Sequence, residues 1–458
     1  AAAKLRDEAH FIATGVIYQI SSVNKTLYRT TPLASLPSSH HALDIGSLDD
    51  HPRSNVAVNT DEGTFRQLII ESNVLNSSNY NKWNWEVIQR IIEGPLTNGK
   101  RLEEAIKASK FMKRIMSFYR PFKYKFSEVK SSRNSQKYVR AGCSLMHALL
   151  QSNEGVKYLS DNKLLRQIAE CIAQCDPTSG LTAQDPMFSK DRLADTLCGG
   201  YFPMLGALSG DVKGMQMLDR WRIFNMLYRI LDLKQRPDLI KLMLSNFDYS
   251  LQGHPRVLLS KALTAGTKEI RIYATNVLRK YATRPAVSVP SQEPNDSKWA
   301  IQLLVTQLYD PEVEVCATAV KILEKACNTK NNLEYIVECR PALDHLGEIG
   351  APLLLRFLST SIGYHYLDGL DYISNEMDDW FLGRNDTYVS VVEASLARAF
   401  LEPVQQEEHA NRLSVFEDDQ EMEVDAHVPP HFYRELTRTE EGCKLLSEKG
   451  HFDEFAAT

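Results

Sequence analysis

Apolar residues recur along most of the chain at the spacing of an α-helix. In VLLSKALTAGTKEIRIYATNVLRKYA (257–282) and IQLLVTQLYDPEVEVCATAVKILEKAC (301–327) they fall at positions i, i+3, i+4 and i+7, which places them on one face of a helix. The two-residue alternation that is typical of β-strands is hard to find. The pattern therefore predicts an all-α fold.

The same two stretches match each other at a fixed offset of 45 residues. Each is expected to be a helix, a short turn and a second helix, and this period is that of HEAT and armadillo repeats. We predict a HEAT/armadillo-like helical-repeat solenoid, in which each unit buries its apolar face against its neighbours. The aligned pairs are Leu258 with Leu303, Leu259 with Leu304, Leu263 with Leu308, Ile270 with Val315, Ala274 with Ala319 and Leu278 with Leu323.

A second pattern is glycine followed by apolar, any, apolar and Leu. We expect a glycine that ends one turn with a short helix after it. The four copies begin at Gly155, Gly214, Gly363 and Gly442.

Three segments interrupt the helical pattern: residues 29–63, rich in Ser, Pro, Asp and His, the proline-rich residues 284–297, and residues 402–427, with nine acids against Arg412. Such compositions favour linkers and mobile loops. We predict a helical segment at 1–28, a flexible linker at 29–63, helical repeats at 64–401, an acidic loop at 402–427 and a further helical repeat at 428–458.

The composition is that of a soluble globular protein, with 43% hydrophobic and 24% charged residues in 458. No apolar run has the length of a membrane span and no signal-peptide pattern begins the chain, so we expect a cytoplasmic location. The start, Ala-Ala-Ala, suggests a fragment of a longer protein. Without a CxxC motif, the scattered cysteines are expected to be reduced core thiols; they are 143, 171, 175, 198, 316, 327, 339 and 443.

The common catalytic motifs are absent from the sequence, including the P-loop, GxGxxG, GxSxG and HExxH. The strongest metal candidates are His427 and His431 in HVPPH, with Cys443 and His451 further on, but the two prolines favour an extended loop with ordinary histidines. Cys171 and Cys175, at i and i+4, favour core packing. We expect neither an enzyme nor a metal site.

Charge is strongly segregated in the sequence. From Ala105 to Arg140 there are eleven Lys or Arg against one acid, Glu128, although the whole chain has a net charge of −5. The first part of this window, KRLEEAIKASKFMKRIMSFY, is expected to be one helix ended by Pro121, with Glu103 paired to Lys107 at i, i+4.

On that helix Lys110, Lys113 and Arg114 share one face, opposite an apolar stripe. Like charges at this spacing repel, so the three cations need an anion, or water and salt. Four interpretations remain open: a solvated face, a site for a nucleotide or inositol polyphosphate, a dock for an acidic partner segment, and binding of nucleic acid or anionic lipid.

The stretch NSSNYNKWNWEVIQRIIEGP strengthens the phosphate interpretation. Asn79 or Asn81 is expected to cap the helix that follows, and a helix N-terminus offers backbone N–H groups to an anion. If this helix and the basic helix form a hairpin, the turn lies near Phe118 to Arg120, at the edge of the same site.

Several stretches in order resemble the Rictor family, the non-kinase subunit of TOR complex two. Among them are NWEVIQRIIEGPL, RLEEAIKASKFMKRIMSFYRPF, RPALDHLGEIGAPLLLRFLS and PPHFYRELTRTEEGCKLL, and the resemblance to a fungal-type member runs from about Phe65 to Phe455. It implies the middle part of a helical-repeat scaffold that docks on the TOR kinase, obstructs the kinase's rapamycin-binding domain, holds the Sin-type subunit and presents AGC kinases as substrates. It also implies that the basic helix is a nucleotide site without turnover.

We therefore expect a non-catalytic scaffold of TOR complex two that requires no cofactor and would hold ATP or an inositol polyphosphate at Lys110, Lys113, Arg114, Asn79 and Asn81. Neither nucleic acid nor a membrane span is expected, and the complex as a whole would bring the chain to the plasma membrane. A general helical-repeat adaptor for inositol phosphates or acidic peptides is the alternative. An atypical nucleotide hydrolase is the weakest hypothesis, because no residue is placed to activate water.

Overall fold

The computed structural model describes residues 60–179, 181, 183–283, 297–401, 428–451 and 453. In this part of the chain helices dominate, and extended pairing is limited to one bridge between Lys130 and Thr196. The all-α prediction is confirmed. The predictions for residues 1–28, for the acidic loop and for almost all of the linker and the proline-rich segment fall outside the described residues, and a helix already begins at Glu62.

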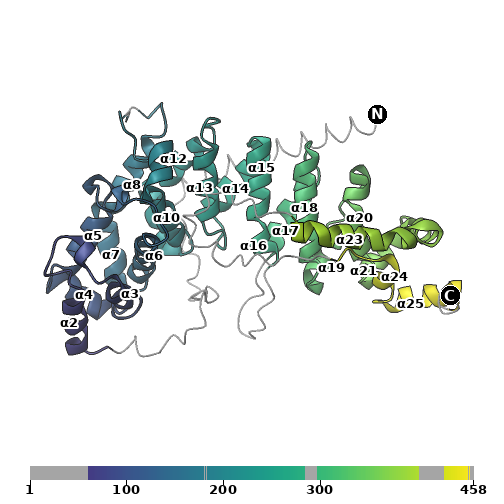
Figure 1. Cartoon of the computed structure of the whole chain (residues 1–458), viewed down its shortest axis with the longest axis horizontal. Coiled ribbons are helices and arrows are strands. Elements are labelled where there is room, and N and C mark those ends of the chain that lie inside the picture. Colours follow the sequence, from purple (N-terminus) through teal and green to yellow (C-terminus); the bar gives the residue numbers. More distant parts are fainter. Residues whose placement is uncertain are drawn as a thin grey trace. The chain divides into compact units, whose positions relative to one another are not determined.

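The described residues form two compact units, which meet in the chain at residues 261 and 262. The amino-terminal unit holds α2 (Glu62–Glu71), α3 (Trp85–Glu93), α4 (Gly99–Lys107), α5 (Phe111–Tyr119), α6 (Gln136–Leu150), α7 (Asn153–Asp161), α8 (Lys163–Ala173), α9 (Lys190–Asp195), α10 (Tyr201–Ser209), α11 (Val212–Arg220), α12 (Ile223–Ile230), α13 (Pro237–Asn246) and most of α14 (His254–Ala265) (Figure 1).

The carboxy-terminal unit is also built of helices. It holds α15 (Lys268–Val277), α16 (Arg279–Ala282), α17 (Lys298–Gln307), α18 (Val313–Ala326), α19 (Lys330–Glu338), α20 (Ala351–Phe357), α21 (Ser361–Asp368), α22 (Tyr372–Asp379), α23 (Asn385–Leu401), α24 (Phe432–Leu436) and α25 (Glu440–Lys449).

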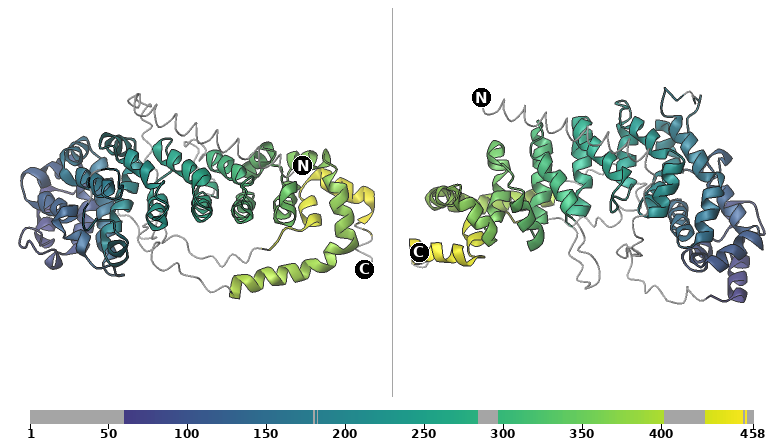
Figure 2. Two further views of the ribbon diagram at one scale, coloured as in Figure 1. Left: turned by 90° about the horizontal axis from the view of Figure 1, so that it is seen from above. Right: turned by 180° about the vertical axis from the view of Figure 1, so that it is seen from behind.

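The two matched repeats have the predicted form of helix, turn and helix. The first is α14 and α15, and the second is α17 and α18. All the aligned apolar residues are buried except Leu303, which is partly exposed. In the carboxy-terminal unit α18 packs on α15, α17 and α20, and α21 on α19 and α20 (Figure 2). This neighbour-to-neighbour packing is that of a helical-repeat solenoid.

In the amino-terminal unit α6 lies at the centre, between α3 and α10. Its Gly142 faces the side chains of Met204 and Tyr119 at a distance that leaves no room for a Cβ. Buried tyrosines satisfy their hydroxyls on backbone carbonyls: Tyr119 donates to Tyr138 at 2.6 Å, and Tyr201 donates to Tyr119 at 2.5 Å. Such pairing is what allows a polar ring in a core.

The recurring glycine pattern is a corner between two helices. In each copy a Ser, Asp or Thr caps the second helix, and its side-chain oxygen accepts a hydrogen bond from the glycine N–H three residues later. A Cβ on the glycine would overlap the carbonyl oxygen six residues earlier, in the preceding helix. The glycine is thus the third residue of the second helix, and the prediction that it ends a turn is wrong. The caps are Ser152, Asp211, Thr360 and Thr439.

Candidate functional site

The predicted basic helix is two helices, α4 and α5, which join at residues 108–110. Ser109 causes the break, because its hydroxyl donates to the carbonyl of Ala105 at 3.2 Å and accepts from the N–H of Phe111 at 3.3 Å, so that it replaces helical hydrogen bonds. Lys110 takes the N-cap position of α5. The prediction of one continuous helix is wrong, although the pair of Glu103 and Lys107 on α4 is confirmed.

The break leaves the three predicted cations in different environments. Lys110 and Lys113 are exposed, and neither has an ion pair or a hydrogen bond from its side chain to the described residues. Arg114 is partly buried, and its Nη1 donates to the carbonyls of Val74 at 2.7 Å and Leu75 at 3.0 Å. Arg114 therefore holds the turn at Val74 and Leu75 against α5. The other two cations, Lys110 and Lys113, remain available to a ligand.

The asparagine-rich turn does not cap the helix as predicted. Asn79 caps a single 3-10 turn, Tyr80–Lys82, by accepting from the N–H of Asn81 at 3.0 Å. The N-cap of α3 is Asn84, whose side chain accepts from the N–H of Val87 at 3.3 Å. Its position directly before the apolar run WEVIQRII was the sequence signal for this cap.

The predicted neighbourhood of the turn is confirmed. The ring centroid of Tyr80 lies 4.9 Å from that of Phe118, and Trp85 lies 5.1 Å from the same ring. The indoles of Trp83 and Trp85 donate to the carbonyls of Ser77 and Tyr80. These contacts fix the turn against α5 at Phe118, which follows Arg114 by one helical turn.

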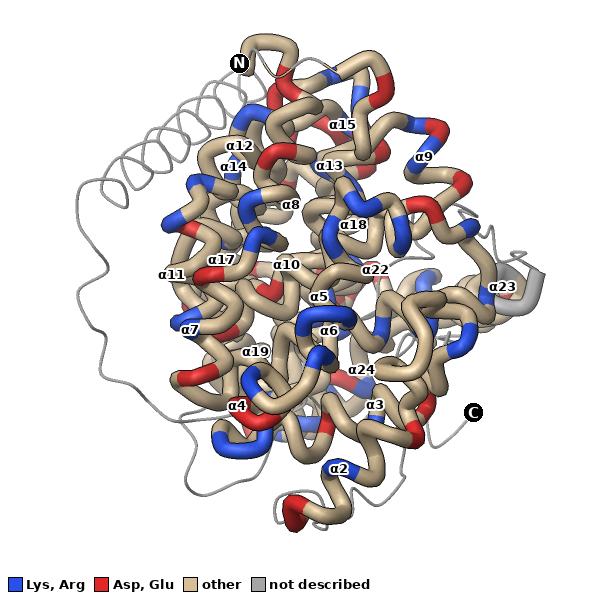
Figure 3. The backbone as a smooth tube through the Cα atoms, turned by 90° about the vertical axis from the view of Figure 1, so that its left-hand side faces the viewer, with Lys and Arg blue, Asp and Glu red and all other residues tan. Residues whose placement is uncertain are grey.

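Lys110, Lys113, Asn79 and Asn81 offer hydrogen-bond donors of the kind that suit an anion. Asn79 and Asn81 are exposed, like Lys110 and Lys113, and ammonium and amide groups donate hydrogen bonds to phosphate oxygens. Figure 3 shows the lysines and arginines that recur along the backbone around α5 and α6.

Cys171, Cys175 and His431, which the sequence singled out, lie in packed regions. Cys171 is buried and Cys175 partly buried, burial raises the pKa of both thiols, and no cysteine forms a disulfide within the described residues. The ring of His431 lies 4.6 Å from that of Tyr388 and 4.7 Å from that of Trp380, and burial lowers its pKa. His427 lies outside the described residues. Within the described residues no group of His, Cys, Asp or Glu is arranged to hold a metal ion.

Known proteins with the same sequence pattern decide the family. Two family profiles match consecutive parts of the chain: "Rapamycin-insensitive companion of mTOR, middle domain" at residues 179–282, and "Rapamycin-insensitive companion of mTOR RasGEF_N domain" at residues 295–402. Target of rapamycin complex 2 subunit ste20 of Schizosaccharomyces pombe is 40% identical over 100% of this chain. The chain belongs to the Rictor family.

Other Rictor relatives are more distant. Protein pianissimo A of Dictyostelium discoideum is 32% identical over 86% of the chain, and Rapamycin-insensitive companion of mTOR of Homo sapiens is 32% identical over 82% of the chain. The higher identity to a yeast protein fits the expected fungal type. The match to ste20 also takes in residues 1–64, which precede the stretch that was expected to resemble the family.

The chain is shorter than the Rictor proteins it matches. It spans 34% of the length of ste20, 34% of pianissimo A and 21% of the human protein. None of its described helices combines the length and the apolar character that crossing a bilayer demands.

Proposed function

We propose that this chain is the non-catalytic, helical-repeat part of a TOR complex two subunit, which organises the TOR kinase, the Sin-type subunit and AGC-kinase substrates in the cytoplasm. The observation that carries the proposal is the 40% identity over the whole chain to a protein named as a subunit of that complex. A stack of helix pairs supports a scaffold role, because such arrays present extended surfaces to several partners. Peripheral association with the plasma membrane would then come through the complex.

The proposal is tested by immobilising the 458-residue chain and offering it purified TOR kinase and Sin-type subunit. Retention of either protein, at a concentration where an unrelated helical-repeat protein retains neither, is expected. If the chain retained neither the kinase nor the Sin-type subunit, the result would contradict the scaffold role.

A second function, an adaptor for nucleotides or inositol polyphosphates, is supported by Lys110 and Lys113, two exposed cations without a carboxylate partner among the described residues. Asn79 and Asn81 are exposed on the turn that packs against α5. Arg114 contributes by fixing that turn. ATP or inositol hexakisphosphate would bind there without turnover and raise the melting temperature, since a ligand selective for the native state stabilises it.

Thermal unfolding with and without millimolar ligand at low salt tests this second function. The informative variant is Lys110→Glu with Lys113→Glu, which should abolish the shift and leave the unliganded melting temperature nearly unchanged. Substitution of Arg114 is unsuitable, because it removes the hydrogen bonds to Val74 and Leu75. An unchanged melting curve of the original chain would exclude the site, and hydrolysis of ATP would contradict the non-catalytic role.

A further inference from the structure

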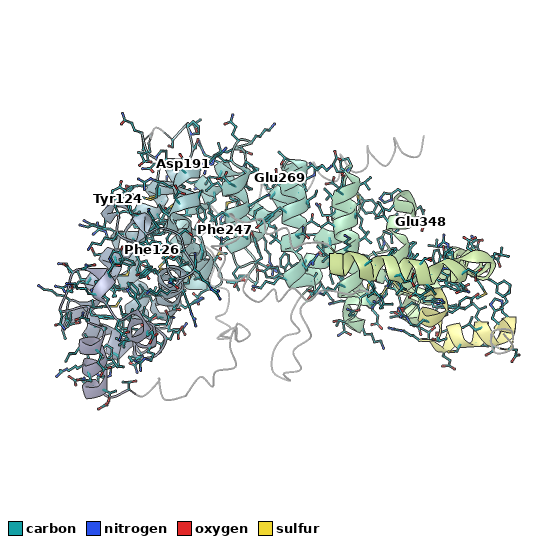
Figure 4. All side chains as sticks on the ribbon, in the orientation of Figure 1. Tyr124, Phe126, Asp191, Phe247, Glu269 and Glu348 are labelled. Carbon is teal, nitrogen blue, oxygen red and sulfur yellow. The ribbon has the colours of Figure 1, made fainter. Side chains whose placement is uncertain are left out.

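The loop between α5 and α6 is built to expose one aromatic ring. Two 3-10 turns, Pro121–Lys123 and Phe126–Glu128, fold it. Phe126 is fully buried, with its ring 5.1 Å from Tyr119 and 5.2 Å from Tyr201, whereas Tyr124 is 49% exposed (Figure 4). Phe126 therefore anchors the loop in the core, and Tyr124 lies on the surface of the unit.

The backbone at Tyr124 is held in a conformation that a bulky residue seldom adopts. Its φ is 52° and its ψ is 30°, in the left-handed region that favours glycine and asparagine. The N–H of Tyr124 and the hydroxyl of Ser127 both donate to the carbonyl of Pro121, at 3.1 and 2.9 Å. A strained residue that the surroundings hold in place is a pointer to function. Here the retained side chain is a surface tyrosine.

Tyr124 lies in a strongly basic part of the chain. Glu128, the single acid between Ala105 and Arg140, is bound by Arg192 at 2.5 Å, and Arg192 also binds Asp185 and lies 5.8 Å from the Tyr124 ring. Five cations of the loop and the first turn of α6 have no ion pair with a described residue: Lys123, Lys125, Lys130, Arg133 and Lys137. We call these five cations and Tyr124 the polybasic face.

The neighbouring helix α9 offsets only part of this charge. Asp191 and Asp195 of α9 are exposed, and the loop is joined to α9 by the hydrogen bond from the N–H of Ser131 to the carbonyl of Asp195, at 2.9 Å. The five cations therefore outnumber the two exposed carboxylates of α9.

We propose that the polybasic face docks this chain directly on an anionic lipid bilayer. Tyr124 would enter the headgroup region, where amphipathic rings are favoured, and the flexible Lys and Arg side chains would reach lipid phosphates and carboxylates. An acidic peptide fits less well, because it needs a groove between the cations and Tyr124 is a protruding ring. Single-stranded nucleic acid also fits less well, because Arg192 already occupies one face of the ring on which a base would stack.

This inference goes beyond the proposed scaffold function and does not depend on it. The test is co-sedimentation of the 458-residue chain with phosphatidylcholine vesicles that contain or lack phosphatidylserine. The chain should bind only the vesicles with phosphatidylserine. Lys123→Glu with Lys125→Glu should weaken that binding by at least about 25-fold, since the loss of each lysine near an anionic membrane costs about fivefold. Tyr124→Asn, which suits the left-handed backbone, should weaken it several-fold.

One matched double variant controls for net charge. Lys444→Glu with Lys449→Glu reverses two exposed lysines of α25 and should leave vesicle binding unchanged, with circular dichroism as the check on folding. Three results would overturn the proposal: no binding to phosphatidylserine vesicles, a larger loss from Lys110→Glu with Lys113→Glu than from the loop pair, or binding to polyglutamate without binding to vesicles. Because no partner protein is present, failure here is distinct from failure of the scaffold function.

Discussion

Arg271 and Asp310 form a bidentate ion pair that joins consecutive helical repeats. Nε of Arg271 donates to one carboxylate oxygen at 2.9 Å and Nη2 to the other at 3.1 Å. The Asp310 side chain is 2% exposed, and its Oδ1 also accepts from the N–H of Glu312, just before α18, at 2.9 Å. The pair therefore ties α15 to the turn between α17 and α18.

Asp310→Ala should lower the free energy of unfolding by about 3 kcal/mol, because it leaves the guanidinium of Arg271 without its partner in a largely buried place. Urea unfolding measures the change. Lys268→Ala, which removes the neighbouring but exposed pair with Glu314, is the control and should have little effect. Equal effects of the two substitutions would contradict the assigned role.

A second prediction concerns the effect on stability of substituting a corner glycine. Gly363→Ala places a Cβ against the backbone carbonyl of Phe357, which cannot move without separating the two helices, and should destabilise the chain by about 2 kcal/mol. Gly383→Ala is the matched control in the same unit, because a Cβ there meets nothing within 4 Å; it should be neutral or stabilise by about 0.5 kcal/mol. Thermal unfolding of both variants gives the comparison. Similar melting temperatures would contradict the claim that a Cβ at a corner glycine clashes with the preceding helix.

The repeats were predictable from the sequence because helical periodicity is a local property. The pairs at an offset of 45, such as Ile270 with Val315, lie where the pattern placed them. The candidate site was predicted less well, because its geometry depends on contacts between distant residues. Nothing in the spacing of Lys110, Lys113 and Arg114 indicated that Arg114 would bind carbonyls some 40 residues earlier in the chain.

Arg114 and Lys113 should differ when each is changed to alanine. Arg114→Ala removes two hydrogen bonds from a charged donor to the turn at Val74 and Leu75 and should cost about 2 kcal/mol. Lys113→Ala should leave stability nearly unchanged, because its side chain is exposed. Hydrogen exchange would localise the effect, with faster exchange expected in residues 73–79 of the Arg114 variant alone. Unaltered exchange in that turn would refute the contact.

Stability should fall as the pH drops below about 7, in part because of His147 on α6. Burial lowers the pKa of this histidine from its ordinary value of 6.5, and Asp248 and Asp211 oppose the shift only in part. The unfolded chain therefore binds a proton more readily than the folded chain, so the contribution of His147 is complete above pH 6.5 and is lost as the pH falls toward the folded-state pKa.

Denaturant unfolding at pH 7.5 and pH 5.5 (values of about one unit on either side of the histidine's ordinary pKa) isolates this contribution. His147→Gln should show a smaller loss of stability between the two conditions than the original chain. An identical pH dependence in both proteins would show that the imidazole does not contribute.

The most direct test of the central claim is assembly with the TOR kinase and the Sin-type subunit. The 458-residue chain, mixed with the two purified proteins, should elute with at least one of them in size-exclusion chromatography, and the destabilised Gly363→Ala variant should elute with less of it than the Gly383→Ala control. Elution of the folded original chain apart from both proteins would contradict its proposed role in TOR complex two.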